Sequence, residues 1–221
     1  VNNGDGTWTF TPAANFNGTV TLGYEIGDGT ATIAGTARLA VTAVNDAPTT
    51  STVLLGRVDE DSGPVIITTA QLLGRASDVE GDPLTVTGVA IAAGSGSLVD
   101  NGDGTWTFTP ASDFNGTVRF TYTISDGTAS AAGVARLVVD PVNDAPTTSE
   151  VTLGPVAEDS GALVITTAQL LGNASDIDGN ALTAGNLVVT AGSGTLVNNG
   201  DGTWTFTPAA NFNGTVTLGY E

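Results

Sequence analysis

The side chains in this sequence that could do chemistry are mostly carboxylates and amides gathered in short motifs. Asp126-Gly follows one strand-like segment, Asp140 ends the next, and Asn143 and Asp144 come directly after it, while Glu60 opens an acidic Glu-Asp-Ser-Gly motif. Calcium takes about six to eight oxygen ligands from carboxylates, amide carbonyls and water. Residues of this kind suit a multivalent cation, although each Asp could instead be a turn residue that bonds its own backbone, the role expected of Asp5, Asp103 and Asp201 in the Gly-Asp-Gly turns.

The residue types that most enzymes rely on are missing. The chain has no histidine and no cysteine, and all of its basic residues are arginines. Histidine is the usual general base near neutral pH and a common metal ligand, and cysteine thiolates are nucleophiles and soft-metal ligands. Catalysis would have to rest on a pair of carboxylates, as in a glycosidase. The sequence therefore predicts that the protein is not an enzyme.

Charge narrows the possible partners further. There are 23 acidic and 5 basic residues, a formal net charge of −18. Nucleic acid and anionic membrane surfaces are both negatively charged, so neither is an expected partner. No apolar run is long enough to predict insertion into a membrane. The acidic surface suits multivalent cations, and halophile-like solvation is the alternative reading.

Internal repeats give the architecture. The string GDGTWTFTPA occurs three times, with Trp8, Trp106 and Trp204 spaced 98 residues apart, and VNDAPTTS occurs twice at the same spacing. A fixed period of this length indicates a tandem array. With the Asn-Asp-Ala-Pro linker as the boundary, residues 1–48 are the C-terminal half of a repeat. Residues 49–146 are a complete repeat, and 147–221 are a repeat that lacks its last strands.

Within a repeat, the local patterns are those of strands. Large apolar residues alternate with Arg and Thr from Val118 to Ile124, and Trp106 and Phe108 alternate with threonines. This period of two places one face in a core and the other in water. Thr68 and Gln71 form a capping box that predicts one short helical turn. The expected fold is all-β, with tandem immunoglobulin-like antiparallel sandwiches.

The incomplete repeats have a consequence for association. Residues 1–48 lack half of a sandwich, so Trp8, Phe10 and Leu22 are expected to be exposed beside unpaired strand edges. The first residues already read as a strand entering a turn, which predicts that the segment begins inside a longer protein. The expected partners are neighbouring repeats of the same chain or other copies of it.

The joint order of the acidic motifs resembles a known family. Asp126-Gly127 at a strand end, Asp140-x-x-Asn143-Asp144 in the linker, Glu-Asp-Ser-Gly at Glu60 and Ser-Asp-x-x-Gly at Ser77 resemble the cadherin-like repeats of giant secreted bacterial adhesins of the RTX type. The resemblance covers the whole chain. It implies a secreted, cell-surface protein in which calcium stiffens a stalk or extender for adhesion and biofilm formation.

The resemblance also implies a ligand set for Ca²⁺ at each linker. At the first linker the implied ligands are Asn45, Asp46, Asp78, Glu80 and Asp126. At the second they are Glu60, Asp113, Asp140, Asn143, Asp144, Asp176 and Asp178. Thr42 stands where the second linker has Asp140, and Asn15 where it has Asp113, so the first linker is expected to bind fewer ions or bind them more weakly.

Two other functions stay open at this point. The repeats could associate into a self-assembling extracellular filament instead of extending as a single-chain stalk. More distantly, the chain could be a carbohydrate- or protein-binding module. Such a module needs exposed aromatic side chains, and each repeat has one Trp, on the strand face predicted to be buried.

Overall fold

The computed structural model describes residues 1–221. The chain divides into two compact units, Val1–Pro141 and Val142–Glu221, and the boundary between them falls in the predicted second linker. Regular structure is almost entirely β, with two helical turns of four residues each. The predicted all-β class with antiparallel sheets is confirmed. The division into three repeat segments stays a prediction.

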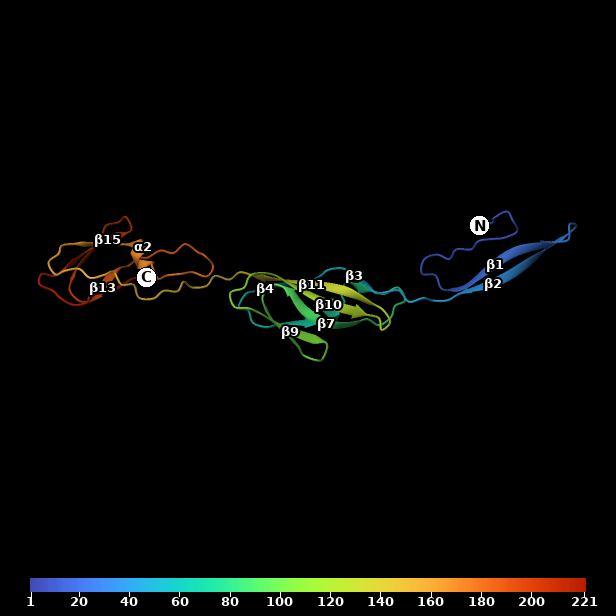
Figure 1. The fold of residues 1–221 in the computed structure, drawn as a ribbon, viewed down its shortest axis with the longest axis horizontal. Helices are drawn as coiled ribbons and strands as arrows, with labels where there is room; N and C mark the ends of the chain where they lie inside the picture. Colours follow the sequence, from blue (N-terminus) through green and yellow to red (C-terminus); the bar gives the residue numbers. More distant parts are fainter. The chain divides into compact units, whose positions relative to one another are not determined.

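The C-terminal part of the first unit, from residue 49 onward, holds its two main sheets (Figure 1). A four-stranded sheet has the order β4-β11-β10-β7, and a three-stranded sheet has the order β5-β9-β8. All pairs in them are antiparallel except β11 with β4, which are parallel. The strands are β4 (Val53–Asp59), β5 (Val65–Thr68), β7 (Thr85–Ala93), β8 (Gly96–Asp100), β9 (Thr105–Pro110), β10 (Gly116–Ser125) and β11 (Ser130–Asp140), with the short pair β3 (Thr49–Thr50) and β6 (Ala76–Ser77) beside them.

The core of this region follows the predicted alternation. The even positions of β10 from Val118 to Ile124 are buried, as are Trp106 and Phe108 of β9. The rings of Phe108 and Phe120 meet edge to face, with centroids 5.2 Å apart and planes at 85°. Each ring comes from a different sheet, so this contact ties the two sheets together through apolar burial.

The helical turn α1 (Thr69–Leu72) anchors one end of the core. Its N-cap Thr68 and Gln71 form the predicted capping box, in which each side chain accepts a bond from the other's backbone N–H. Leu72 is fully buried, and its carbonyl oxygen accepts a hydrogen bond of 2.8 Å from the Tyr122 hydroxyl. The tyrosine thereby fixes the turn to β10.

We expect Tyr122→Phe to lower the free energy of unfolding by about 1–2 kcal/mol, because it leaves the buried Leu72 carbonyl without its donor. The measurement is urea unfolding at neutral pH. Tyr24→Phe is the matched control, since Tyr24 is 49% exposed and should change stability little. Equal losses in the two variants would contradict this role of the Tyr122 hydroxyl.

Residues 1–48 do not bury a core of their own. They contain the hairpin of β1 (Gly18–Gly27) and β2 (Thr32–Val41), two antiparallel strands that pair along their whole length. Trp8 is 72% exposed, whereas Trp106 at the equivalent place in the middle repeat is 4% exposed. Phe10 and Leu22 are exposed as well. The expectation that this segment leaves its apolar face open is confirmed.

The second unit repeats many elements of the middle repeat. Its strands are β12 (Leu163–Thr166), β13 (Val188–Ala191), β14 (Gly194–Asn198), β15 (Thr203–Pro208) and β16 (Thr217–Gly219), with the turn α2 (Thr167–Leu170). Trp204 and Phe206 pack with Ile165, Leu170 and Leu187 in its core. Neither helical turn of the chain approaches the length and hydropathy of a membrane span.

Candidate cation sites at the linkers

The first linker is tied to loops of the middle repeat by polar side chains. The Asn45 side-chain amide donates to Asp126 Oδ2 at 3.0 Å, and the Asp46 backbone N–H donates to Glu80 Oε2 at 3.2 Å. Glu80 in turn donates its backbone N–H to Asp78 Oδ1 at 3.0 Å. The structure therefore joins all five predicted first-linker residues through the adjacent Asn45 and Asp46.

Asp78 of the first linker has an environment that suits a bound cation. Its Oδ1 accepts backbone bonds from Glu80 and from Asp82, the latter at 3.2 Å, which closes an Asx-type turn. Its Oδ2 is buried and accepts no hydrogen bond. Burying a carboxylate oxygen without a donor or a counter-charge costs free energy. A cation beside Oδ2 would satisfy it.

Asp126 is held in its ionised form by three donors. The backbone N–H of Ala129, the amide of Asn45 and the backbone N–H of Thr128 lower the pKa of its carboxyl below the ordinary value of 3.8. Hydrogen bonds to the charged form of an acid stabilise that form. The carboxylate thus clamps its own turn and holds Asn45 of the linker.

This lowered pKa predicts a pH dependence. In the unfolded chain the Asp126 carboxyl has its ordinary pKa, so its contribution to stability is complete above that value and is lost as pH falls through the lower folded value. Asp126→Ala should therefore cost more stability at pH 7 than at pH 3. The check is urea unfolding of both proteins at the two pH values. An equal penalty at both would refute the clamp.

In the first unit, the predicted second-linker residue Asp140 has a cationic side chain as its partner. Asp140 forms a two-pronged ion pair with Arg57, in which Nε donates to Oδ2 at 2.8 Å and Nη2 pairs with Oδ1. The hydrogen bond and the charge of Asp140 raise the pKa of Arg57. Glu60 is 2% exposed, and its backbone N–H donates to the Asp140 carbonyl at 2.8 Å. Arg57 already neutralises the charge of Asp140, so the role of Asp140 as a calcium ligand stays a prediction.

Two acidic side chains, Asp61 and Asp113, lie close together in the same unit. Carboxylate oxygens of Asp61 and Asp113 lie within 4.8 Å of one another. Both residues have left-handed backbone, with φ of 58° and 57°. Such conformations cost free energy in residues other than glycine and gather at functional sites. Asp113 was predicted; Asp61 was missed, although it follows Glu60 in the acidic motif that marked the site.

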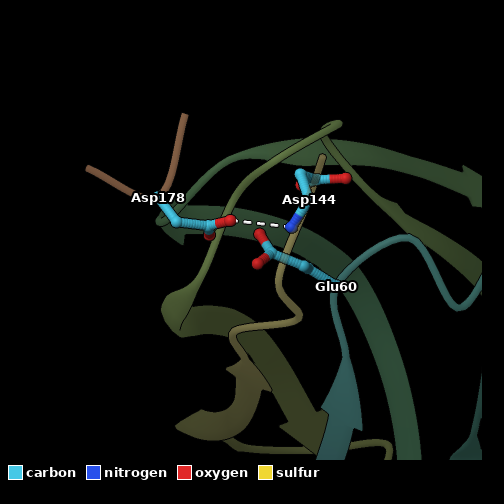
Figure 2. A group of neighbouring side chains, drawn as sticks. All are labelled: Glu60, Asp144 and Asp178. Carbon is cyan, nitrogen blue, oxygen red and sulfur yellow. Dashed lines mark hydrogen bonds between the residues drawn. The ribbon is translucent and has the colours of Figure 1, made fainter. Parts of the chain in front are cut away.

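The second-linker residues of the second unit form their own network. The Asp144 backbone N–H donates to Asp178 Oδ2 at 2.7 Å, as Figure 2 shows. Asn180, which the sequence analysis missed, donates its amide to Asn143 Oδ1 at 2.6 Å and its backbone N–H to Asp176 Oδ1 at 3.1 Å. The structure thus brings together the four predicted residues of this unit. Asn180 lies two residues after Asp178, so the position of this amide beside the acidic motif could have identified it from the sequence.

The family of the chain is shown by a family model that matches nearly all of its residues. The family model described as the cadherin-like domain matches residues 1–42, 44–140 and 142–221. The chain belongs to the cadherin-like domain family. No curated protein matches the sequence.

Several solved structures resemble this cadherin-like chain at low identity. The extracellular cadherin domains 1–5 of protocadherin gamma B2 match with 16% identity over 89% of this chain and 39% of that one, with a TM-score of 0.42. An endo-fucoidan hydrolase of glycoside hydrolase family 107 matches with 18% identity over 95% and 34%, with a TM-score of 0.34. Domains 4–9 of the surface layer protein SbsC match with 14% identity over 93% and 33%, with a TM-score of 0.25. The chain spans less than half of each of these structures, and such TM-scores carry no functional conclusion.

The Gly-Asp-Gly turns of the cadherin-like repeats serve a different purpose from the linkers. Asp103 Oδ1 accepts bonds from the backbone N–H and the hydroxyl of Thr105, at 3.0 and 2.6 Å. The side-chain bond is the main cause of a lowered pKa at Asp103. Asp201 does the same with Thr203. These aspartates close turns, as their spacing predicts, and they provide controls for substitutions at the linkers.

Proposed function

We propose that this cadherin-like chain is a repeat segment of a large secreted bacterial surface protein, in which calcium bound at the linkers stiffens the array. The stiffened array would act as a stalk or extender in adhesion and biofilm formation. Membership of the cadherin-like family supports a structural or adhesion-type extracellular module. The net charge of −18 supports a role for cations, which neutralise clustered carboxylates.

The observation that carries the proposal is the buried, unpartnered Oδ2 of Asp78 at the first linker. Asp46 and Glu80 meet through a hydrogen bond beside the same turn. The side-chain atoms that could ligate a metal here are all oxygens, which calcium prefers. The set contains no nitrogen or sulfur ligand of the kind that a softer metal prefers. The donor set fits calcium.

The proposed ligands of the first linker are Asp46, Asp78 and Glu80, with Asn45 and Asp126 positioned to join them. In the second unit Asp144 and Asp178 have carboxylate oxygens within 4.8 Å of each other, and they are the proposed core of the second-linker set. Bound calcium would supply the counter-charge that lets acidic groups from a linker and a loop lie together. Each site would then restrict the motion of its linker.

Calorimetric titration of calcium into the full chain tests the proposal. We expect binding in the weak extracellular class, with Kd of about 10⁻⁴–10⁻³ M. Asp78→Asn keeps the Oδ1 acceptor that closes the turn and removes the charge, so it should abolish binding at the first linker. Asp103→Asn, in a Gly-Asp-Gly turn, is the control and should bind normally. Unchanged binding by the Asp78 variant, or no binding by the native chain, would reject the site.

A further inference from the structure

The outer face of the four-stranded sheet carries an unusual pair of like charges. Arg119 of β10 and Arg136 of β11 are direct cross-strand partners, and both are exposed. Like charges opposite one another destabilise a sheet. The one ion pair in the chain is that of Arg57 and Asp140, so neither Arg119 nor Arg136 has a carboxylate partner.

A third arginine is brought to the same face by a β-bulge. In the parallel pairing of β4 with β11, Leu54 lies opposite Arg136, and the register then shifts so that Arg57 lies opposite Val138. Leu54 and Arg57 are three residues apart and would point to opposite faces of a regular strand. Gly56, with a φ of +104°, provides the irregular backbone that places both on one face.

These residues line a shallow groove of about 340 Å³. Its walls are Leu54, Gly56, Arg57, Thr117, Arg136 and Val138. The groove therefore combines two guanidinium groups with two aliphatic side chains and one hydroxyl. Arg57 is oriented by its ion pair with Asp140, while Arg136 and the neighbouring Arg119 are available to a ligand.

The pair of opposed arginines is specific to the middle repeat, because Arg119 has no basic counterpart, although Arg136 corresponds to Arg38 of the first hairpin. The four strands of the sheet contain three arginines and only two acidic residues, Asp59 and Asp140, both at strand ends. At the positions equivalent to Arg119, the other repeats have Thr21 and Thr217. Solubility does not explain why these arginines are present, because the carboxylates of a chain with net charge −18 already make its surface soluble.

We propose that this face, formed by Arg57, Arg119 and Arg136, binds an acidic polysaccharide through its carboxylate or sulfate groups. Guanidinium groups recognise such planar or multi-oxygen anions with paired hydrogen bonds. A sugar ring also offers hydroxyls and an apolar face of C–H bonds, which suit the Thr117 hydroxyl and the Leu54 and Val138 side chains. The anion would relieve the repulsion between Arg119 and Arg136.

A second copy of the chain is a less suitable occupant. Each copy carries a net charge of −18, so two copies repel one another over about a Debye length, roughly 8 Å at physiological ionic strength. A flexible polysaccharide can bring single anionic groups to the arginines without bringing a folded acidic surface along. None of the three arginines is a proposed calcium ligand, but Asp140, which orients Arg57, is an implied ligand of the second linker, so the test is made without calcium.

The test is binding of defined oligosaccharides to the full chain in the presence of a calcium chelator. The probes are sulfated dextran and oligogalacturonate, which distinguish sulfate from carboxylate, with uncharged dextran as the blank. We expect one of the two anionic probes to bind, and binding to weaken as salt is raised. Arg119→Thr combined with Arg136→Ser should weaken binding at least about tenfold, because each loses a charged hydrogen bond. Arg119→Thr copies the residue of the other repeats, which favours normal folding.

The control is Arg75→Ser, compared with Arg119→Thr alone, since each removes one positive charge and Arg75 lies outside the four strands of the face. Arg75→Ser should bind like the native chain, and Arg119→Thr should bind more weakly. Equal weakening by these two single variants would show a non-specific charge effect and overturn the proposal. Absence of binding to both anionic probes would also overturn it. So would concentration-dependent dimers that the Arg119 and Arg136 substitutions abolish without any binding of polysaccharide, since the occupant would then be a second copy.

Discussion

Replacing Phe108 by alanine is expected to lower the free energy of unfolding of the middle repeat by about 3–5 kcal/mol. Phe108 is fully buried in β9 and meets Phe120 of the other sheet edge to face at 5.2 Å. The substitution removes the aromatic contact and leaves a cavity between two sheets that cannot close fully. Urea unfolding followed by tryptophan fluorescence measures the loss, with Trp106 as the reporter in the same strand.

Ile66→Ala is the matched control for this substitution. Ile66 lies in β5, opposite Thr107 of β9, and is 51% exposed. Its truncation should cost less than about 1 kcal/mol, since little buried surface is lost. If the two variants lost equal stability, the core would not be centred on the Phe108–Phe120 contact.

Removing calcium is expected to have the second-largest effect, a fall in melting temperature on the order of 10 °C. A ligand that binds only the folded state stabilises it by mass action, by about 2.7 kcal/mol at a concentration 100 times Kd. One kcal/mol corresponds to about 4–8 °C for a domain of this size. Calorimetric melting with calcium and with excess chelator measures the difference.

The control for this prediction separates specific binding from screening of the net charge of −18. Sodium chloride at matched ionic strength screens exposed charges without occupying a site, so it should restore only part of the stability. Asp78→Asn should show a smaller difference between calcium and chelator than the native chain. Equal melting temperatures with and without calcium would contradict the calcium sites.

The fold could largely be predicted because its strands follow simple local rules. The alternation from Val118 to Ile124 placed the correct residues in the core, and the Thr68–Gln71 capping box predicted the helical turn. The exposure of Trp8 followed from the strands that residues 1–48 lack. Local periodicity cannot predict the parallel pairing of β11 with β4, because these strands are far apart in the sequence.

The residues of the candidate sites could be predicted where they belong to a sequence motif. Their partners could not be predicted where the contact depends on the tertiary fold. The motifs identified the first-linker residues that the structure connects, from Asn45 to Asp126. They did not reveal that Asp140 pairs with Arg57, because that contact joins residues 83 positions apart. The left-handed backbone of Asp61 was also hidden, since an acidic motif predicts oxygen ligands but not their conformation.

The arginine face is the clearest case of a feature that only register reveals. Arg119 and Arg136 are isolated basic residues in the sequence, and each alone reads as the polar side of a strand. Their cross-strand pairing places the two charges directly opposite each other. The bulge at Gly56, which adds Arg57, has no signal in the alternation of β4 beyond the glycine itself.

Small-angle scattering of the full chain, titrated with calcium, tests the central claim most directly. Calcium bound at the linkers should restrict them, so the account predicts a larger radius of gyration and a narrower range of conformations at saturating calcium. Chelator should reverse both changes, and Asp78→Asn should reduce them. Scattering curves that are the same with calcium and with chelator, at matched ionic strength, would contradict the claim that calcium stiffens this cadherin-like array.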